Sequence, residues 1–421
     1  MVGSDNERAE GVIGVWWAML LGFGLAAGLS LVGFLIAERP LSRLFGVVGL
    51  ALAVGLGVTI PEAVRAQPNG LMLLIATVGA LAAVIGGYWL GASLLTSVAP
   101  IPAVATLEST EAEDARVGLV AVACVEPERY RLRATLREAT SLQQAADAHI
   151  PEFALPFLLG SERARYRSVG GSKARAQLRH LLDAVHERLP GERFLPPLAA
   201  WCVGEPYPDQ AVAKLVEAGV RRIVVFPVSV APSARMRQAL DRLTELHPSA
   251  EGVGLIDVPY LADLAPLDEH LADGIAALVP ESARANAGVA LVGTGQPHEW
   301  DRVYPEGPDE ETAFMQRVRL ALGERGFDQE RVRLVWAEWR QPDVTDGVRH
   351  LAALGCSRVV VAPACEPFAT LSVKLDVAQA IRLARLDDAT EVETLPSWGD
   401  DAELAAMIAE SLERAVAPQA E

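Results

Sequence analysis

The chain has 421 residues, 51% of them hydrophobic and 22% charged, and its mean hydropathy is +0.23. Residues 1–107 hold four arginines, no lysine and five acids, whereas residues 108–421 hold the other 33 basic and 49 acidic residues. This division excludes a wholly soluble protein and a transporter with many spans, and the net charge of −17 argues against nucleic acid and against docking on anionic lipid.

Three apolar stretches dominate the N-terminal part. Residues 11–37, 44–60 and 70–95 run for 27, 17 and 26 residues without a charged side chain. About 20 apolar residues cross the hydrocarbon core of a bilayer as a helix. We therefore predict that residues 1–95 form a membrane anchor with three transmembrane helices.

Small residues recur within these stretches. The pairs Gly24/Gly28 and Gly87/Gly91 have the spacing that lets membrane helices pack closely, although Gly is also common in such helices in general. No ionisable residue lies inside the three stretches, and an ion or proton path normally needs one. The predicted helices are therefore an anchor or an assembly surface.

The arginines beside the spans favour one orientation. Arg39 and Arg43 lie in the first loop, whereas Arg8 and Arg65 lie on the opposite side, which favours the cytoplasm for the first loop. Three spans place the following residues on that same side. We therefore predict a multi-pass protein of the cell (inner) membrane with cytoplasmic soluble lobes, joined to the anchor by a flexible Pro/Ala-rich linker over residues 96–115.

From residue 116 onward, short apolar runs alternate with amphipathic segments. Continuous apolar strands that alternate with helices are typical of a parallel sheet covered on both faces. The predicted strands are residues 117–124, 197–202, 222–227, 288–293, 332–336 and 358–363, and the predicted helices are residues 173–189, 210–218, 312–325 and 344–354.

The order of elements repeats after about 136 residues. Residues 217–227 and 353–363 share a helix end, a Gly, a strand and a closing Pro. This internal duplication predicts an α/β fold with two similar Rossmann-like lobes and parallel sheets, over residues 116–280 and 281–421. In such folds ligands bind in the cleft at the carboxyl ends of the strands.

Residues 166–172, Tyr-Arg-Ser-Val-Gly-Gly-Ser, resemble the Tyr-Arg-x-Ile-Gly-Gly-x-Ser segment of the ferrochelatase family. Other turns of that family are matched in the same order by residues 117–127, 201–206, 227–233, 336–342 and 360–371. The resemblance covers roughly residues 116–415 and implies the chelatase fold with a porphyrin or haem as ligand. The ligand-binding positions that it implies are Tyr166, Arg167, Ser168, Gly170, Gly171, Ser229, Ser233 and Thr294. Trp336 and Trp339 are expected either to line the cleft, where aromatic walls suit a flat tetrapyrrole, or to pack in the core.

Two departures from the family pattern concern the chemistry. The family's catalytic His falls on Thr294 and its catalytic Glu on Ala369. Metal insertion needs a base for the pyrrole protons and donors that deliver the metal, and neither Thr nor Ala supplies them. The sequence therefore predicts a protein without normal ferrochelatase catalysis, with His298 and Glu366 as possible substitutes.

Three cysteines end predicted strands, and each is followed closely by Glu-Pro. Thiolates at Cys124, Cys202 and Cys365 suit iron, zinc or haem iron, so a metal or haem site is one hypothesis. Ordinary buried thiols are the alternative. Glu338 follows another strand, so carboxylates are also expected in the cleft. Four cysteines in a chain of this length do not indicate a disulfide scaffold.

Three functions fit these observations. The first is a membrane-anchored protein that binds a tetrapyrrole, or an accessory subunit, without inserting metal. The second is an active chelatase, a lyase of the ferrochelatase type, with a rearranged site. The third is a structural subunit of a larger membrane complex with a vestigial cleft. The expected partners are the lipid bilayer, a tetrapyrrole and subunits of a membrane complex.

Overall fold

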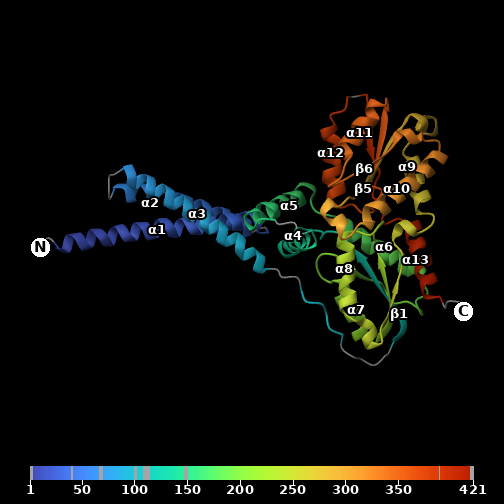
Figure 1. The fold of residues 1–421 in the computed structure, drawn as a ribbon, viewed down its shortest axis with the longest axis horizontal. Coiled ribbons are helices and arrows are strands. Elements are labelled where there is room, and N and C mark those ends of the chain that lie inside the picture. Colours follow the sequence, from blue (N-terminus) through green and yellow to red (C-terminus); the bar gives the residue numbers. More distant parts are fainter. Residues whose placement is uncertain are drawn as a thin grey trace. The chain divides into compact units, whose positions relative to one another are not determined.

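The computed structural model describes residues 3–38, 41–65, 70–98, 102–107, 114–146, 150–387 and 389–417. The chain forms two compact units (Figure 1). The first contains residues 1–101, 130–144 and 148–167, and the second contains residues 102–129, 145–147 and 168–421. Arg39 and residues 99–101 and 108–113 of the predicted linker lie outside the described residues.

The first unit begins with three long helices, α1 (Gly3–Ile36), α2 (Leu41–Arg65) and α3 (Gly70–Val98). Each contains a candidate membrane span by length and composition: Val15–Ile36, Leu41–Glu62 and Leu74–Leu95. Large apolar side chains on these helices face outward, among them Leu50, Val54 and Leu81. The prediction of three long apolar helices is therefore confirmed.

The paired glycines bring α1 and α3 into close contact. A Cβ added at Gly28 would lie 2.1 Å from the Val84 carbonyl oxygen, and one added at Gly87 would lie 2.1 Å from the Leu25 oxygen. Only a residue without a side chain allows this approach. The glycine spacing thus marks a packing interface and does not merely reflect the abundance of Gly.

Two further helices complete the first unit. They are α4 (Leu132–Ala146) and α5 (Leu155–Val169), preceded by a short 3₁₀ turn, η1 (Glu152–Ala154). Leu136 and Leu159 form a buried cluster with Val32, Ile36 and Leu95 of the apolar helices. The predicted first lobe therefore includes a segment, residues 130–167, that packs largely with the apolar helices.

The second unit contains two four-stranded parallel sheets with the same strand order. The first sheet has the order β2-β1-β3-β4 and the second β6-β5-β7-β8. The strands are β1 (Asp114–Ala123), β2 (Leu198–Trp201), β3 (Val220–Pro227), β4 (Gly254–Asp257), β5 (Gly288–Gly293), β6 (Val332–Trp336), β7 (Arg358–Ala362) and β8 (Glu391–Thr394). The identical order confirms the predicted fold class and duplication.

Helices cover both faces of each sheet (Figure 1). In the first lobe, α6 (Ala174–Arg188) and α13 (Ala402–Val416) oppose α7 (Pro208–Glu217) and α8 (Ala234–Glu245). In the second, α9 (Leu267–Ala277) and α10 (Glu306–Glu324) oppose α11 (Val344–Ala353) and α12 (Ala378–Ala384).

One hydrophobic core extends through both lobes. It includes Leu119 of β1, Leu291 of β5 and Leu412 of α13. The C-terminal helix α13 follows the second lobe in the chain but packs beside α6 of the first, where Arg193 Nη2 donates a hydrogen bond to the Val416 oxygen (2.8 Å). The two lobes are therefore joined by packing as well as by the chain.

Part of the predicted linker is held against the first lobe. Asp209 is fully buried at the start of α7 and accepts hydrogen bonds from the Ala105 N–H (2.8 Å) and from Nε and Nη2 of Arg242 (2.6 and 2.9 Å). Arg242 also donates to the carbonyl oxygens of Pro102 and Ala103. Residues 102–107 are therefore fixed by a buried ion pair and are not a flexible tether.

We expect Asp209→Ala to destabilise the protein by about 3–5 kcal/mol, because it leaves the Arg242 guanidinium desolvated and unpaired. Denaturant unfolding measures this loss, and faster proteolysis near residues 102–107 accompanies it. The control is Glu306→Ala, which breaks the exposed Arg237–Glu306 pair and changes stability by no more than about 1 kcal/mol. Equal effects of the two substitutions would contradict the role of the buried pair.

Candidate functional site at the carboxyl ends of the two sheets

The loops that follow β1 and β7 meet at the junction between the lobes. The Leu371 N–H donates to Glu126 Oε1 (2.7 Å), and the Ala369 N–H donates to Gln177 Oε1 of α6 (2.8 Å). Both loops follow the carboxyl ends of central strands, where ligands bind in open α/β folds. The junction is therefore the candidate site.

Four carboxylates gather at this junction. Glu366 follows β7 and is partly buried, and burial raises its pKa to about 8, with further contributions from the charges of Glu126, Glu311 and Glu338. A hydrogen bond with the Thr370 side chain opposes the shift without cancelling it. Glu366 therefore holds a proton at neutral pH.

Glu311 is the one of these four carboxylates that was not predicted from the sequence. It lies in the first turns of α10, is buried, and accepts a hydrogen bond from the Gly295 N–H (3.2 Å) and others from Thr294. Burial raises the pKa of Glu311. Gly295 has a φ of +79°, and a Cβ there would lie 2.3 Å from the backbone carbonyl oxygen of Glu338, so only Gly allows this turn.

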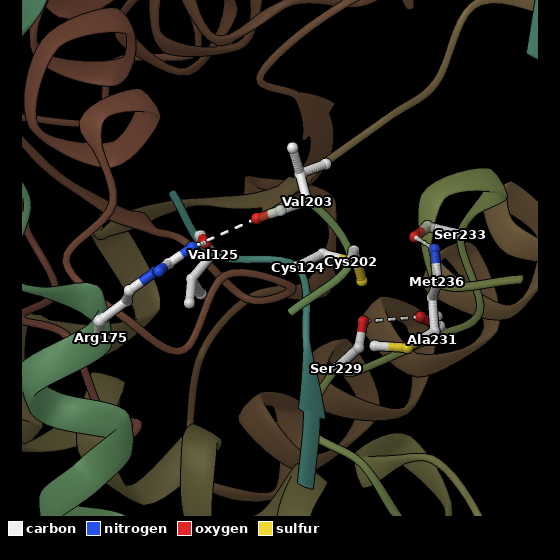
Figure 2. The surroundings of a disulfide bond; sticks show 9 residues. All are labelled: Cys124, Val125, Arg175, Cys202, Val203, Ser229, Ala231, Ser233 and Met236. Carbon is white, nitrogen blue, oxygen red and sulfur yellow. Dashed lines mark hydrogen bonds between the residues drawn. A yellow bond between two sulfur atoms is a disulfide. The ribbon is translucent and has the colours of Figure 1, made fainter. Parts of the chain in front are cut away.

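Cys124 and Cys202 form a disulfide that links the ends of β1 and β2, with their Cα atoms 4.8 Å apart (Figure 2). Neither sulfur is a thiolate in this state. Cys365 is a buried thiol whose pKa is raised by burial and by the charges of Glu311 and Glu366. The disulfide contradicts both predictions for Cys124 and Cys202, as metal-binding thiolates and as ordinary thiols, whereas Cys365 is a buried free thiol. Among the described residues, no three His, Cys, Asp or Glu side chains are placed to hold one metal ion together.

An arginine supports the disulfide loops from α6. Arg175 Nη2 donates to the carbonyl oxygens of Val203 (3.2 Å) and Val125 (3.5 Å), each one residue beyond a disulfide cysteine (Figure 2). Its guanidinium also lies 4.0 Å from the centre of the Trp201 ring. The loops after β1 and β2 are thus held together by the disulfide and by hydrogen bonds from Arg175 to both.

The two serines predicted to bind ligand make local hydrogen bonds. Ser229 Oγ donates to the Ala231 oxygen (2.8 Å), and Ser233 caps α8 by accepting from the Met236 N–H (3.2 Å) (Figure 2). These contacts explain both residues as loop and helix-cap positions. A role in ligand binding stays a prediction for both.

The predicted aromatic and histidine positions differ in exposure. Trp336 ends β6 and is nearly buried, whereas Trp339 is 62% exposed and donates from Nε1 to Glu338 Oε2 (3.0 Å). His298 is largely exposed, and its Nδ1 lies 3.4 Å from Asp301 Oδ2. Both oxygens of Asp301 contact Arg340 Nη2 (2.5 and 2.6 Å), so Asp301 forms an ion pair with Arg340.

The Tyr-Arg-Ser-Val-Gly-Gly segment combines a buried ring with a tight turn. Tyr166 is buried in the first unit, with its ring centre 6.1 Å from that of Tyr130, and Arg167 and Ser168 are exposed. Within the second unit, Gly170 and Gly171 have φ values of +75° and +114°. Lys374, in the π-helical turn η7 (Ser372–Val377), donates to the Gly171 oxygen (3.4 Å).

We expect Glu366→Gln to stabilise the protein at pH 9 by on the order of 1–3 kcal/mol and to change little at pH 5. The folded-state pKa is about 8 against an ordinary 4.5, so the folded state keeps a proton that the unfolded chain loses, and stability falls as the pH rises through this window. Unfolding curves at pH 5, 7 and 9 measure the effect. Glu410→Gln, on an exposed helix face, is the control. The same shift at pH 5 and pH 9 would show that folding does not raise the pKa of Glu366.

Comparisons with known proteins relate the chain to the chelatases. Residues 307–415 match the model of the CbiX family. A coproporphyrin III ferrochelatase of Mycobacterium bovis is 30% identical over 181 residues, covering 38% of this chain and 48% of the relative. The corresponding protein of Mycolicibacterium vanbaalenii is 29% identical over 176 residues, covering 38% and 50%. The chain thus spans about half the length of the curated relatives that it matches.

Among solved structures, SirB from Bacillus subtilis with Fe3+ aligns with a TM-score of 0.43 and 10% identity, covering 72% of this chain and 96% of that chain. The sirohydrochlorin chelatase SirB from Bacillus subtilis subspecies spizizenii, in complex with cobalt, aligns with a TM-score of 0.41 and 10% identity, covering 72% and 97%. By sequence, the chain is a chelatase-like protein related to the ferrochelatases, with its CbiX match confined to residues 307–415.

Proposed function

We propose that this chain is a membrane-anchored, chelatase-like protein that binds a porphyrin or haem at the junction of its two lobes, or serves there as an accessory subunit, without inserting metal. The observation that carries the proposal is the hydrogen bonding of Thr294, at the family's His position, to the buried Glu311. The candidate spans α1–α3 would hold the lobes at the membrane, where an apolar macrocycle is available.

The state of the carboxyl groups supports this choice. Metal insertion requires acceptors for two pyrrole protons. At neutral pH Glu366 already holds a proton, since its pKa is about 8. Ala369, at the family's Glu position, has no ionisable group, and its N–H bonds to Gln177. Glu366 is therefore already protonated at neutral pH, and position 369 offers no side chain that accepts a proton.

An active chelatase with a rearranged site is the second candidate, and the carboxylate cluster favours it. Glu126, Glu311, Glu338 and Glu366 lie close enough that the first three raise the pKa of the fourth. A divalent metal, arriving as substrate, would relieve this repulsion and favour loss of the proton. A structural subunit with a vestigial cleft is the third candidate.

Titration of the full chain in lipid nanodiscs with coproporphyrin III and with haem tests the first proposal. We expect a saturable shift of the Soret band, and no metalloporphyrin bands after anaerobic addition of Fe²⁺ or addition of Zn²⁺ at pH 7. Empty nanodiscs control for partition of the macrocycle into lipid. Catalytic metal insertion at pH 7 would overturn the proposal, whereas the absence of any binding would leave the structural subunit.

The second candidate makes a different prediction about pH. If the chain inserts metal through the carboxylate cluster, the rate rises between pH 7 and pH 9 as Glu366 loses its proton, and Glu366→Gln removes that rise. Glu391→Gln, on the exposed edge strand β8, is the matched control and leaves the rate unchanged. A rate that is the same at both pH values would exclude Glu366 as the proton acceptor.

A further inference from the structure

The segment formed by α4, η1 and α5, here called the α4–α5 hairpin, has a charge opposite to that of the rest of the folded body. Its residues 130–144 and 148–167 carry six arginines and three glutamates, whereas the second unit carries 27 basic and 46 acidic residues. Arg131, Arg133 and Arg167 are exposed. The net charge of the whole chain therefore conceals a basic region beside the candidate membrane spans.

The hairpin also exposes large apolar side chains. Phe153 and Phe157 are 46% and 58% exposed, and Leu158 is exposed beside them. The ring centre of Phe153 lies 6.0 Å from that of Trp89, and the Phe157 ring centre lies 5.7 Å from that of Tyr88. Trp89 and Tyr88 belong to the candidate span Leu74–Leu95, so the exposed apolar surface of α3 continues onto the hairpin.

Buried hydrogen bonds fix the hairpin to one end of the apolar helices. Arg163 is buried, and its Nη1 donates to the carbonyl oxygens of Phe34 and Ala37 (both 2.7 Å). The Tyr130 hydroxyl donates to the Ile36 oxygen (3.0 Å). These donors satisfy carbonyls at the C-terminus of α1, where a cation is also favoured by the helix dipole. The hairpin therefore keeps a constant depth relative to the ends of the spans.

We propose that the α4–α5 hairpin lies in the headgroup region of the bilayer leaflet next to the C-terminal ends of α1 and α3. Phe153, Phe157 and Leu158 enter the acyl boundary, and the exposed arginines bind anionic phospholipid headgroups. The inference rests on the part of the proposed function in which α1–α3 span a bilayer.

Spin-label depth measurements test the apolar contact. The full chain carrying Phe157→Cys is labelled with a nitroxide in nanodiscs of phosphatidylcholine and phosphatidylglycerol, with the unsubstituted chain as background. We expect the label to collide more often with oxygen, which concentrates in lipid, than with a water-soluble nickel chelate. Leu320→Cys, at an exposed apolar position on α10, is the aqueous control and should show the reverse order.

A label at Val54→Cys, exposed within α2, separates failure of this inference from failure of the anchor. If Val54 reports lipid and Phe157 reports water, the spans are embedded and the hairpin proposal is wrong. If both report water, the membrane anchor itself is wrong. Lipid contact at both positions supports the proposal.

Lipid selectivity tests the arginines. The preference of the protein for spin-labelled phosphatidylglycerol over phosphatidylcholine should fall by at least about twofold when Arg131, Arg133 and Arg167 are all changed to Gln. The control removes the same charge from exposed positions in the second unit by changing Arg179, Arg188 and Arg414 to Gln. An equal loss of selectivity in both variants, or no loss in either, would overturn the headgroup contact.

Discussion

Burial of both faces of two parallel sheets is the constraint on which the second unit depends. The inner strands β1, β3, β5 and β7 each contain a continuous apolar run because helices cover them on each side. Acidic residues are therefore largely excluded from the sheet faces. They collect on the outer surface and in the loops beyond the strands, where Glu126, Glu338 and Glu366 meet.

Two cations near the carboxyl groups at the junction make hydrogen bonds elsewhere. Arg340 is bound to Asp301, and Lys374 donates to the Gly171 oxygen. Like charges held close together in a partly buried place favour protonation, which is why the pKa of Glu366 lies near 8. A proton or an incoming cation would consequently reduce the repulsion between the carboxyl groups at the junction.

The sequence was sufficient to predict elements whose residues are buried on both sides. The central strands, the helices α6, α7, α10 and α11, and the duplication follow from apolar runs repeated after about 136 residues. The edge strands β4 and β8 were missed because they are short and partly exposed. The α4–α5 hairpin was missed because its partners, such as Val32 and Leu95, are distant in the sequence.

The site was predictable only in outline. The positions of Glu126, Glu338 and Glu366 after predicted strands indicated that carboxylates would meet, since the carboxyl ends of parallel strands share one edge. Glu311 lies in an acidic helix start that looks solvent-exposed in the sequence. Cys124 and Cys202 were located correctly at neighbouring strand ends, but the pattern does not distinguish two thiolates from a disulfide.

The disulfide has a mechanical consequence. It closes a covalent ring between residues separated by 78 positions, and the α4–α5 hairpin leaves and rejoins the second unit inside that ring, at Arg129 and Ser168. The two chain segments that lead to and from the hairpin are therefore tied together by a covalent bond as well as by the β1–β2 pairing. Reduction would leave only noncovalent links between these segments, among them the β1–β2 hydrogen bonds and the contacts of Arg175 with both loops.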